Sequence, residues 1–526
     1  MDAITLGLFA SRIEAVCDEM GAVLRRSAFS TNIKDRLDFS CAVFDARGHL
    51  CAQAAHIPVH LGSMAYAMAD IVSGQDWRPG DMLVVNDPYL GGTHLPDVTL
   101  IAPVFVAGQL LGFVANRAHH ANIGADSPGS MPISRTLEEE GIVIPPTFLQ
   151  RNDMIQAALF ARLCGEQGED SLAAGDFRAQ ISANAIGVKR LAALIEDSGS
   201  KHYQTSLVAL NDYAERLATR TLQGIPPGRY TFRDVMDDDG VGAENIPIVV
   251  ALNLAEGRVS VDFAGTGPQV SGNINCPLPV TAAAVLYVFR CLMPSRMPAC
   301  AGAFRPIQLS APRATLVNAE RPAAVAAGNV ETSSRIVDTA LGALVQALPD
   351  RVPAASQGTM NNIAMGALAS GRCRRWDYYE TIGGGLGASA RGPGLSGVQS
   401  HMTNTLNTPV ESVETHYPLR ISQYGLRQGS GGVGRYAGGM GLVREYQFLA
   451  AADVTLLTER RRHRPWGSAG GGDGCPGENT LNGKPLNGKC QLRVRTGDKL
   501  RIATPGGGAW GQLGTPISNG GHPGLE

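Results

Sequence analysis

The sequence lacks the features that mark several common functional classes. Its formal net charge is −2 over 526 residues, so a strong attraction to nucleic acid or to a membrane surface is not expected. No segment approaches about 18 uninterrupted apolar residues, which argues against a membrane-spanning helix. The N-terminus carries Asp2 and no basic stretch before an apolar core, so no signal peptide is predicted. We therefore expect a cytoplasmic protein with neither a nucleic-acid nor a membrane partner.

Paired cysteines and aromatic residues are also scarce. The ten cysteines are scattered and form no CxxC pair, which favours buried reduced thiols over a disulfide framework or a zinc knuckle. Aromatic residues make up 6% of the chain, whereas glycine is frequent, with 64 residues. Many tight turns and much irregular backbone are therefore expected.

No nucleotide-binding motif is present, although glycine clusters occur at 383–387, 429–434 and 470–474. None of them matches GxxxxGK[ST], and none is a strand–GxGxxG–helix unit with an acidic residue about 20 positions later. Turns and close backbone packing are the favoured interpretation of these glycines. The chain alone is therefore expected not to hydrolyse ATP.

The chain is long enough for more than one domain, and its apolar fraction of 44% is globular. We predict a mixed α+β fold with several domains. A β-rich N-terminal region is expected over 1–149 and a helical section over 150–224. A mixed α/β region is expected over 225–375, followed by a glycine-rich, β-rich region over 376–526.

Hydrophobic periodicity places individual elements within these regions. Apolar residues at spacings of three and four predict a first helix over about 6–24. Alternating residues on either side of a turn predict a β-hairpin over 38–53, and a short helix is expected over 64–72. Two later helices are predicted over 280–293 and 333–349.

Histidines are concentrated in the N-terminal region, and one loop there carries the strongest signal. Of the 11 histidines, six precede residue 121. The loop reads NDPYLGGTHLPDVTL and holds His94 and Asp97. If 98–106 and 110–118 form a hairpin centred on Gly108, Asp97 faces His119, with Cβ atoms ~4.5–5.5 Å apart.

Two imidazoles and one carboxylate at this separation suit a divalent transition metal with open coordination positions. Zinc, manganese and iron all accept such ligands. The alternative is that His94 caps a loop and His119 is a hydrogen-bonded residue at a strand end. From spacing alone, both interpretations stay open.

Long, specific motifs run along nearly all of the chain. They are AQAAHIPVHLGSM, NDPYLGGTHLPDVTL, RAHHANIGADSPGSMP, EEGIVIPP, GNINCPLPVTAAA, AAGNVETSSRIVD, ASQGTMNN, YYETIGGGLGA, HMTNTLNTPVE and GGVGRYAGGMGLVREY. Together they resemble the hydantoinase B/oxoprolinase family. That family includes the B subunits of ATP-dependent hydantoinases and caprolactamase, the C-terminal half of 5-oxoprolinase, and subunits of acetone and acetophenone carboxylases.

The resemblance implies a metal held by His94, Asp97 and His119, with zinc favoured. It also implies that Asp38, in the motif RLDFS, is a further ligand or a near neighbour of the metal. The chain departs from the family where relatives commonly read HHADIGG, because Asn122 replaces an acidic residue and Ala125 replaces a glycine.

Three residues are candidate catalytic groups beside the metal. Glu140 precedes Gly141 in the family's EG-IPP motif, and a carboxylate near a metal-bound water can move protons; a solvated turn is the alternative. Asp38 is the second candidate. His120 is the third, although it points to the opposite face of the strand from His119 and a core or supporting role is favoured.

Several other polar residues have simpler interpretations. In HIPVH, an extended segment would place His56 and His60 on one face, but direct ligation by either is disfavoured. Asp87 is expected to anchor its loop, and Thr332 or Ser333 to cap a helix. Amide-rich stretches suit a cyclic-amide substrate, with buried loop stapling as the alternative; their candidate residues are Asn361, Asn362, His401 and Asn404, with Asn407 nearby.

These features predict the B subunit of an ATP-dependent cyclic-amide hydrolase that opens 5-oxoproline, hydantoin or lactam rings. The resemblance implies a separate hydantoinase A-type subunit that handles ATP and Mg²⁺, and hence a hetero-oligomer. A subunit of an ATP-dependent ketone carboxylase is the alternative enzyme. A non-catalytic scaffold is a third alternative, which the intact His94, Asp97 and His119 disfavour.

Overall fold

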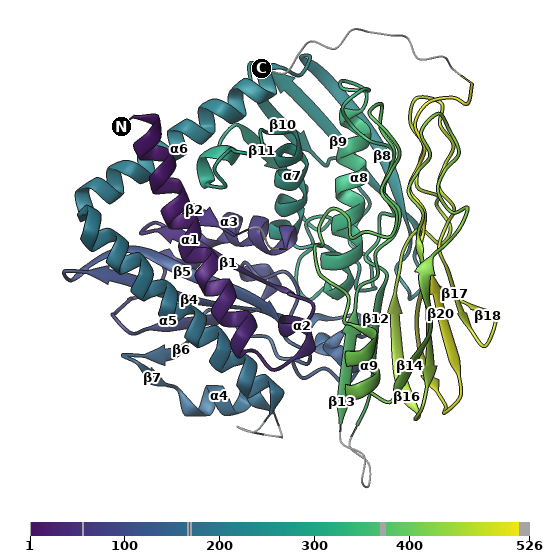
Figure 1. Ribbon diagram of the computed structural model, residues 1–526, viewed down its shortest axis with the longest axis horizontal. Coiled ribbons are helices and arrows are strands. Elements are labelled where there is room, and N and C mark those ends of the chain that lie inside the picture. Colours follow the sequence, from purple (N-terminus) through teal and green to yellow (C-terminus); the bar gives the residue numbers. More distant parts are fainter. Residues whose placement is uncertain (1, 55–56, 166–167, 169–170, 369–374, 515–526) are drawn as a thin grey trace.

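The computed structural model describes residues 2–54, 57–165, 168, 171–368 and 375–514 (Figure 1). His56 lies outside the described residues. Within them, no helix is both long and apolar enough to cross a membrane. The fold mixes antiparallel sheets with helices, as predicted, and the four-part division of the chain stays a prediction.

A seven-stranded sheet forms the N-terminal part, with strand order β2-β1-β5-β4-β3-β6-β7. The predicted hairpin over 38–53 is confirmed, because β1 and β2 pair antiparallel. Strands β4 and β5 join at Ala107 and Gly108, whose φ angles of 49° and 78° are those of a two-residue hairpin turn. The strands are β1 (Phe39–Asp45), β2 (Leu50–Gln53), β3 (Met82–Val85), β4 (Asp97–Val106), β5 (Gln109–His119), β6 (Thr147–Arg151) and β7 (Met154–Ile155).

Helices cover both faces of this sheet. On one face, α1 (Ala3–Ser27) crosses the sheet beside α5 (Leu172–Ser198), as Figure 1 shows. Helix α1 begins at Asp2, whose carboxylate accepts a hydrogen bond from Thr5 N at 2.9 Å. Apolar residues of α1 at the predicted spacing are buried against the sheet and α5, namely Phe9, Ile13, Val16, Met20 and Leu24.

The opposite face is covered by α3 (Pro58–Ser73). This helix begins earlier than the predicted 64–72, because proline fits a first helical turn, where the missing N–H would be unpaired. The early start matters for the site, since it turns His60 toward the sheet. Helix α3 also packs on α7 (Leu278–Leu292), and a Cβ on Gly62 would lie 2.6 Å from Ala283 Cα.

The central part combines long helices with a second sheet of order β11-β10-β9-β8. The helical section is largely as predicted, although β6 and β7 occupy its first residues. A short π-helix (Gly328–Thr332) leads into α8, and neither Thr332 nor Ser333 makes the predicted side-chain cap. The remaining elements are α2 (Thr31–Lys34), α4 (Ala157–Cys164), α6 (Ser200–Gln223), β8 (Gly228–Asp238), β9 (Glu244–Ala255), β10 (Arg258–Asp262), β11 (Ile307–Ser310) and α8 (Ser333–Leu344).

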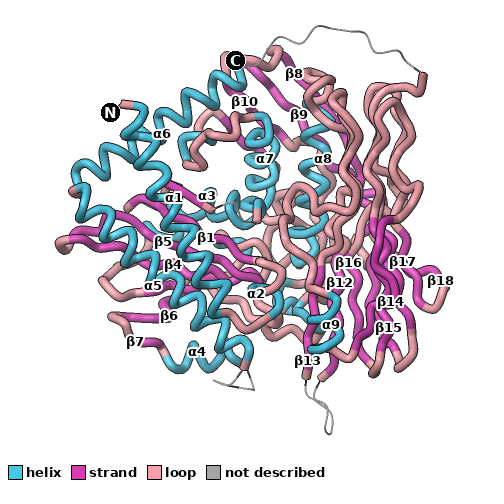
Figure 2. The backbone as a smooth tube through the Cα atoms, viewed as in Figure 1, coloured by secondary structure: helices cyan, strands magenta, loops and turns pink. Residues whose placement is uncertain are grey.

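The C-terminal part is built from two sheets of order β13-β12-β16-β19 and β14-β15-β20-β17-β18. Long loops run beside these strands (Figure 2). Their glycines bring backbone against backbone, since a Cβ on Gly387 would lie 1.8 Å from Ala354 O. The elements are β12 (Asn362–Ala367), β13 (Trp376–Glu380), α9 (Val410–His416), β14 (Leu419–Leu426), β15 (Leu442–Phe448), β16 (Ala452–Leu457), β17 (Glu478–Leu481), β18 (Lys484–Leu486), β19 (Lys489–Val494) and β20 (Lys499–Ala503).

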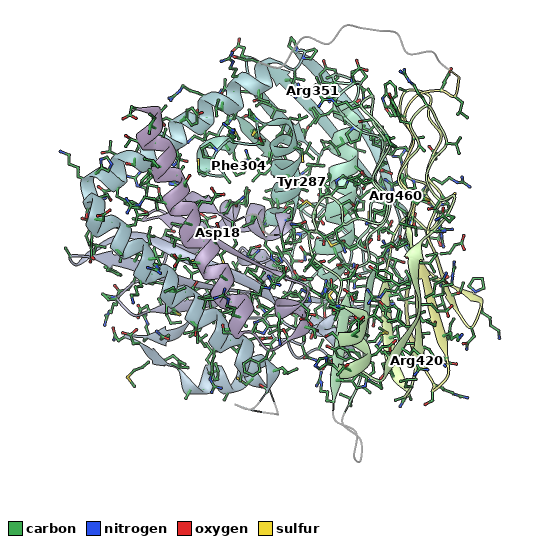
Figure 3. All side chains as sticks on the ribbon, viewed as in Figure 1. Asp18, Tyr287, Phe304, Arg351, Arg420 and Arg460 are labelled. Carbon is green, nitrogen blue, oxygen red and sulfur yellow. The ribbon has the colours of Figure 1, made fainter. Side chains whose placement is uncertain are left out.

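Buried ion pairs tie the central and C-terminal parts together. Arg460, labelled in Figure 3, is 1% exposed and contacts Asp234 of β8 at 2.8 Å and Asp338 of α8 at 3.0 Å. His401 contacts the other oxygen of Asp338 at 2.9 Å. One apolar cluster also extends from Phe9 to Leu457. The core therefore continues through most of the chain.

Candidate metal centre

The loop between β3 and β4 is fixed by buried polar contacts. Asn86 donates to Leu95 O at 2.8 Å and Ile142 O at 2.9 Å, and its side-chain oxygen accepts from Ile144 N. Arg117, 1% exposed, donates to Gly91 O at 2.9 Å. Such fully paired buried groups hold a loop in one conformation.

The predicted anchoring role of Asp87 is confirmed at the same loop. Its carboxylate accepts from Tyr89 N at 3.1 Å and forms an ion pair with Arg321. Gly92 allows the chain to pass closely, because a Cβ there would lie 2.2 Å from Asn86 O. The histidine and aspartate of this loop are thus held by a rigid frame.

His94, Asp97 and His119 converge at the end of the hairpin. Asp97 lies directly opposite His119, which confirms the predicted register. His94 Nε2 and His119 Nδ1 are 3.2 Å apart, and Asp97 Oδ1 lies 3.2 Å from the first nitrogen and 3.1 Å from the second. All three side chains are at most 2% exposed.

These distances fit a shared cation. Ligand atoms of a tetrahedral zinc site, each about 2.0–2.1 Å from the ion, lie roughly 3.4 Å apart. Two buried imidazole nitrogens aimed at one another compete for a single proton when no cation joins them. The ring of Tyr379 stacks on His119 at 4.5 Å between centroids and fixes its plane. The donor set suits a transition metal.

The ring orientation of His94 is set by the backbone. His94 Nδ1 lies 3.3 Å from Ala326 O, so an N–H at Nδ1 donates to that carbonyl and leaves the lone pair on Nε2. Partners of this kind orient metal-ligating histidines. Nε2 is the atom that faces Asp97 and His119, as ligation requires.

The second carboxylate oxygen of Asp97 is also occupied. Thr93 Oγ1 donates to Asp97 Oδ2 at 2.6 Å, and His60 Nε2 lies 3.1 Å from it. Asn329 Nδ2 approaches the same oxygen at 3.4 Å. The structure thus brings His60 into contact with the triad. The extended segment on which a shared face of His56 and His60 depended is not found from Pro58 onward, where α3 begins.

Burial and neighbouring charges shift the pKa values of these groups in opposite directions. For Asp97, burial alone would raise the pKa, but the nearby His60 and His94 hold it well below its usual value. Burial lowers the pKa of His119. For His94, burial opposes protonation, yet the adjacent Asp97 carboxylate raises its pKa. An ionised aspartate and a neutral imidazole are the forms that bind metals, so protons compete with a cation for His94 as the pH falls.

A small cavity of about 20 Å³ opens beside the triad, enough for roughly one water molecule. Asp38 lines it, with Oδ1 3.9 Å from His60 Nε2 and Oδ2 3.6 Å from Arg36 Nη2. Asp38 is therefore a near neighbour of the triad. The other lining residues come from distant parts of the chain, which sequence patterns do not bring together: Ile57, Val59, Asn329, Val330, Met360, Tyr379, Thr381, Met402, Thr403 and Thr405.

Glu140 does not line the cavity, and it is linked to His94 through the backbone of Ala326. Its Oε1 accepts hydrogen bonds from Ser134 Oγ at 2.8 Å, Val325 N at 2.8 Å and Ala326 N at 2.9 Å. Ala326 in turn presents its carbonyl oxygen to His94. Glu140 thus positions a ligand through the backbone, and its predicted catalytic role stays a prediction.

Replacing Glu140 by glutamine is expected to change how stability depends on pH. Burial raises the pKa of Glu140 to about 7 from 4.5. Between these values the unfolded chain has lost the proton that the folded chain keeps, so wild-type stability falls as pH rises. By pH 8 this penalty reaches about 3 kcal/mol, and glutamine removes it. Urea unfolding midpoints of both proteins at pH 5 and 8 measure the difference. Equal changes in midpoint between the two pH values for both proteins would contradict a raised pKa of Glu140.

The remaining candidates near the hairpin lie away from the triad. His120 contacts Gln180 Oε1 at 2.9 Å and packs on Phe177 at 4.2 Å between ring centroids. Asn122 donates to Asp377 Oδ1 at 3.2 Å, so an acidic group still sits beside this departure from the family. Ala125 is buried, and its N–H lies 3.3 Å from Ser130 Oγ.

The predicted substrate residues are divided among different environments. Asn362 accepts a hydrogen bond from the Tyr379 hydroxyl and donates to Glu331 at 2.9 Å. The ring of Tyr379 in turn stacks on His119. Asn361 binds Gln357 and Arg461, each at 2.8 Å. His401 pairs with Asp338, and Asn404 is exposed. Their roles in substrate binding stay predictions.

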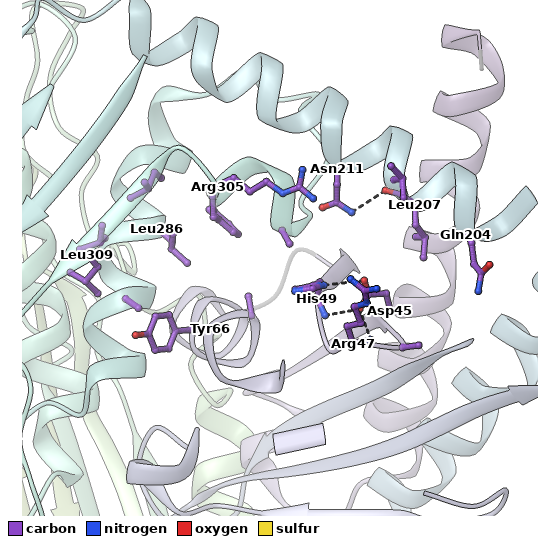
Figure 4. Close-up of a pocket in the computed structure, with 18 of the residues that line it drawn as sticks. Asp45, Arg47, His49, Tyr66, Gln204, Leu207, Asn211, Leu286, Arg305 and Leu309 are labelled. Atoms are coloured by element: carbon purple, nitrogen blue, oxygen red, sulfur yellow. Dashed lines mark hydrogen bonds and ion pairs between the residues drawn. The ribbon is translucent and has the colours of Figure 1, made fainter. Parts of the chain in front are cut away.

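A larger hollow of about 850 Å³ lies apart from the triad, between α3, α6 and α7 (Figure 4). Its polar groups are largely satisfied within the chain. Asp45 contacts His49 at 3.1 Å, Asn211 donates to Leu207 O, and Arg305 pairs with Asp212 and Glu215. Among the described residues that line this hollow, none form a convergent donor set like the triad, so the smaller cavity is the candidate site.

Comparison with known sequences reveals relatives along the whole chain. The sequence pattern of the family described as hydantoinase B/oxoprolinase matches residues 2–513. An uncharacterized protein of Methanocaldococcus jannaschii is 40% identical over 521 residues, which cover 97% of this chain and 91% of that protein. The putative B subunit of a D-/L-hydantoinase from Pseudomonas sp. is 30% identical, with 97% and 90% covered.

Longer relatives and solved structures extend this likeness. 5-Oxoprolinase 1 of Arabidopsis thaliana is 39% identical over 97% of this chain, which spans only 42% of that protein. An ATP-dependent caprolactamase from Pseudomonas jessenii is 26% identical with a TM-score of 0.90, covering 99% of this chain and 93% of that one. Acetone carboxylase has the same fold, with a TM-score of 0.86 at 18% identity, and 97% of this chain covers 76% of it.

Proposed function

Because the chain belongs to the hydantoinase B/oxoprolinase family, we propose that it is the ring-opening subunit of an ATP-dependent cyclic-amide hydrolase. The observation that carries the proposal is the buried triad His94, Asp97 and His119 beside a cavity. These three residues would hold a divalent transition metal, with zinc favoured, and Asp38 would lie near it. The substrate class is 5-oxoproline, a hydantoin or a related lactam.

ATP is handled by a partner subunit of the hydantoinase A type. A cyclic amide is stabilised by resonance, so attack by water is slow until its oxygen is activated. Phosphorylation of that oxygen in the partner makes the ring carbon electrophilic. The motifs of this chain supply no phosphate-binding loop, and one relative carries the name of a hydantoinase B subunit. These two observations support a hetero-oligomer.

The residues of this chain then carry out hydrolysis of the activated ring. A divalent cation held by the triad would supply hydroxide at neutral pH, because such ions can lower the pKa of water to about 7. Asp97 and His119 hold their donor atoms toward one point, and the contact of His94 with Ala326 O keeps its Nε2 available. The Asp38 carboxylate faces the cavity and can accept a proton. Addition of one water at the ring carbon and cleavage of the ring C–N bond, with a proton passing to the ring nitrogen, leave an acyl phosphate. A second water then releases phosphate and the carboxylate.

Reconstitution tests the proposed function. The chain is combined with its A-type partner, ATP, Mg²⁺ and a panel of 5-oxoproline, hydantoins and lactams, and both ADP and the ring-opened product are followed. We expect product only when chain, partner and ATP are all present, with no ATPase activity from the chain alone. ATP hydrolysis by the pure chain, abolished by a mutation within it, would reveal a nucleotide site.

The same experiment separates the hydrolase from the ketone carboxylase. A carboxylase would consume a ketone in a bicarbonate-dependent reaction and would open no cyclic amide. That outcome would overturn the proposed function. The acetone carboxylase likeness establishes the fold alone, and this chain covers 76% of that longer protein. We therefore favour the hydrolase.

A further inference from the structure

The π-helix (Gly328–Thr332) delivers side chains to the metal-centre cavity. Its backbone is tied to a neighbouring loop, where Asn273 O accepts from Ala327 N at 3.0 Å and from Gly328 N at 3.1 Å. A Cβ on Gly328 would lie 1.8 Å from Asn275 O, so this close approach requires glycine. Single π-helical turns occur frequently at functional sites. Here the widened turn places Asn329 and Val330 in the cavity lining.

Asn329 carries a buried acceptor without a donor. Its side chain is 3% exposed, and Nδ2 lies 3.4 Å from Asp97 Oδ2. Because a carboxylate accepts hydrogen bonds, this contact fixes the NH₂ end of the amide toward Asp97. The Oδ1 end has no hydrogen-bond partner among the described residues. A buried carbonyl oxygen of this kind is costly unless something supplies a donor.

A bound substrate can supply that donor. The cyclic amides of the proposed function share a ring N–H next to the carbon that is attacked, and the O-phosphorylated ring keeps this N–H in its protonated, more electrophilic form. We propose that Asn329 recognises this N–H through Oδ1 and so makes the chain specific for rings with an unsubstituted amide nitrogen. This assignment rests on the proposed function. It names the ring N–H as the part of the substrate that Asn329 recognises.

The rest of the lining suits a small ring beside this acceptor once the cavity, which has room for about one water molecule, widens. Val330, Met360 and Met402 present apolar surface to the cavity, which suits ring carbons. Thr381, Thr403 and Thr405 line it as well. A site built to bind a substrate N–H rejects an analogue that lacks it much more strongly than an apolar pocket rejects an extra methyl group.

Binding and metal content test the assignment without relying on turnover. The metal-loaded chain, with its partner present, is titrated calorimetrically with 2-pyrrolidinone and with its N-methyl derivative. We expect the wild type to bind the N–H ring about 10- to 100-fold more tightly, and Asn329→Ala to reduce that ratio to within about 3-fold. Metal content should stay unchanged in the variant. Val330→Ala, which alters the same lining without a polar group, should weaken both rings similarly and preserve the ratio.

Each other outcome overturns the assignment. A wild type that binds both rings equally, or neither, shows that the N–H is not recognised. Loss of metal from Asn329→Ala shows that the residue serves the metal centre instead. Reconstituted ring opening measured in parallel keeps the two proposals apart, because its absence removes the proposed function and this assignment together. Ring opening with an unchanged binding ratio in Asn329→Ala removes this assignment alone.

Discussion

The variants His94→Ala and His119→Ala are expected to lose the bound metal and with it ring-opening activity by at least about 10³-fold. Each imidazole supplies one of three donor atoms that lie 3.1–3.2 Å apart. With one removed, the remaining histidine and carboxylate form a two-ligand site, which binds a transition metal much more weakly. Elemental analysis of purified proteins measures the loss directly, and the reconstituted assay measures activity.

His120 offers a matched control for these substitutions. It is the neighbour of His119 and is equally buried, yet its ring contacts Gln180 and Phe177 instead of the triad. His120→Asn should therefore keep wild-type metal content even if it lowers stability. Full metal content in both His94→Ala and His119→Ala would show that the triad is not the binding site.

A second large effect is expected at Glu380, where replacement by alanine should destabilise the fold by about 3–5 kcal/mol. Its carboxylate lies 3.2 Å from Arg36 Nε and 3.3 Å from Arg444 Nη1, and all three side chains are fully buried. Alanine leaves the buried Arg444 guanidinium without its carboxylate partner and leaves Arg36 with only the more distant Asp38, at 3.6 Å. A lower urea midpoint for Glu380→Ala measures the loss.

An exposed ion pair of the same chain provides the comparison. Arg12 and Asp197 are joined at 2.8 Å, but their side chains are 54% and 66% exposed. Asp197→Ala should therefore cost less than about 1 kcal/mol, since water screens the pair in both states. Similar midpoints for Glu380→Ala and Asp197→Ala would mean that burial does not determine the strength of these pairs.

Arg36 also contacts Asp38 and the ring of Tyr379, so Glu380→Ala should disturb the cavity as well.

The hairpin of the metal centre could be predicted because its information is local. Strand alternation and one Ala-Gly turn determine the register, and the register alone places Asp97 opposite His119. The first helix and the hairpin over 38–53 depend on similarly local patterns. His94 required only its position in the connecting loop. These features depend on residues that are close in the sequence.

The rest of the cavity could not be predicted, because it depends on contacts between distant segments. His60 reaches the triad only because α3 begins at Pro58 and packs on the sheet face. Asn329 reaches it through a π-helix, whose wider turn has no distinctive spacing. Glu140 stands out by its motif, but its contact with Val325 and Ala326 is visible only in three dimensions.

The loop over 402–406 contributes three residues to the cavity lining. Met402, Thr403 and Thr405 line the cavity, whereas Leu406 beside them is 53% exposed. The segment is held by Met402 O, which accepts from Val59 N at 3.4 Å, and by Leu406 N, which donates to Arg36 O at 2.9 Å. A space for about one water molecule cannot admit a ring until residues of the lining move apart. Under the proposed function, an activated ring supplied by a partner would therefore meet few water molecules in this cavity, which favours attack at the ring carbon over loss of the phosphoryl group to bulk solvent.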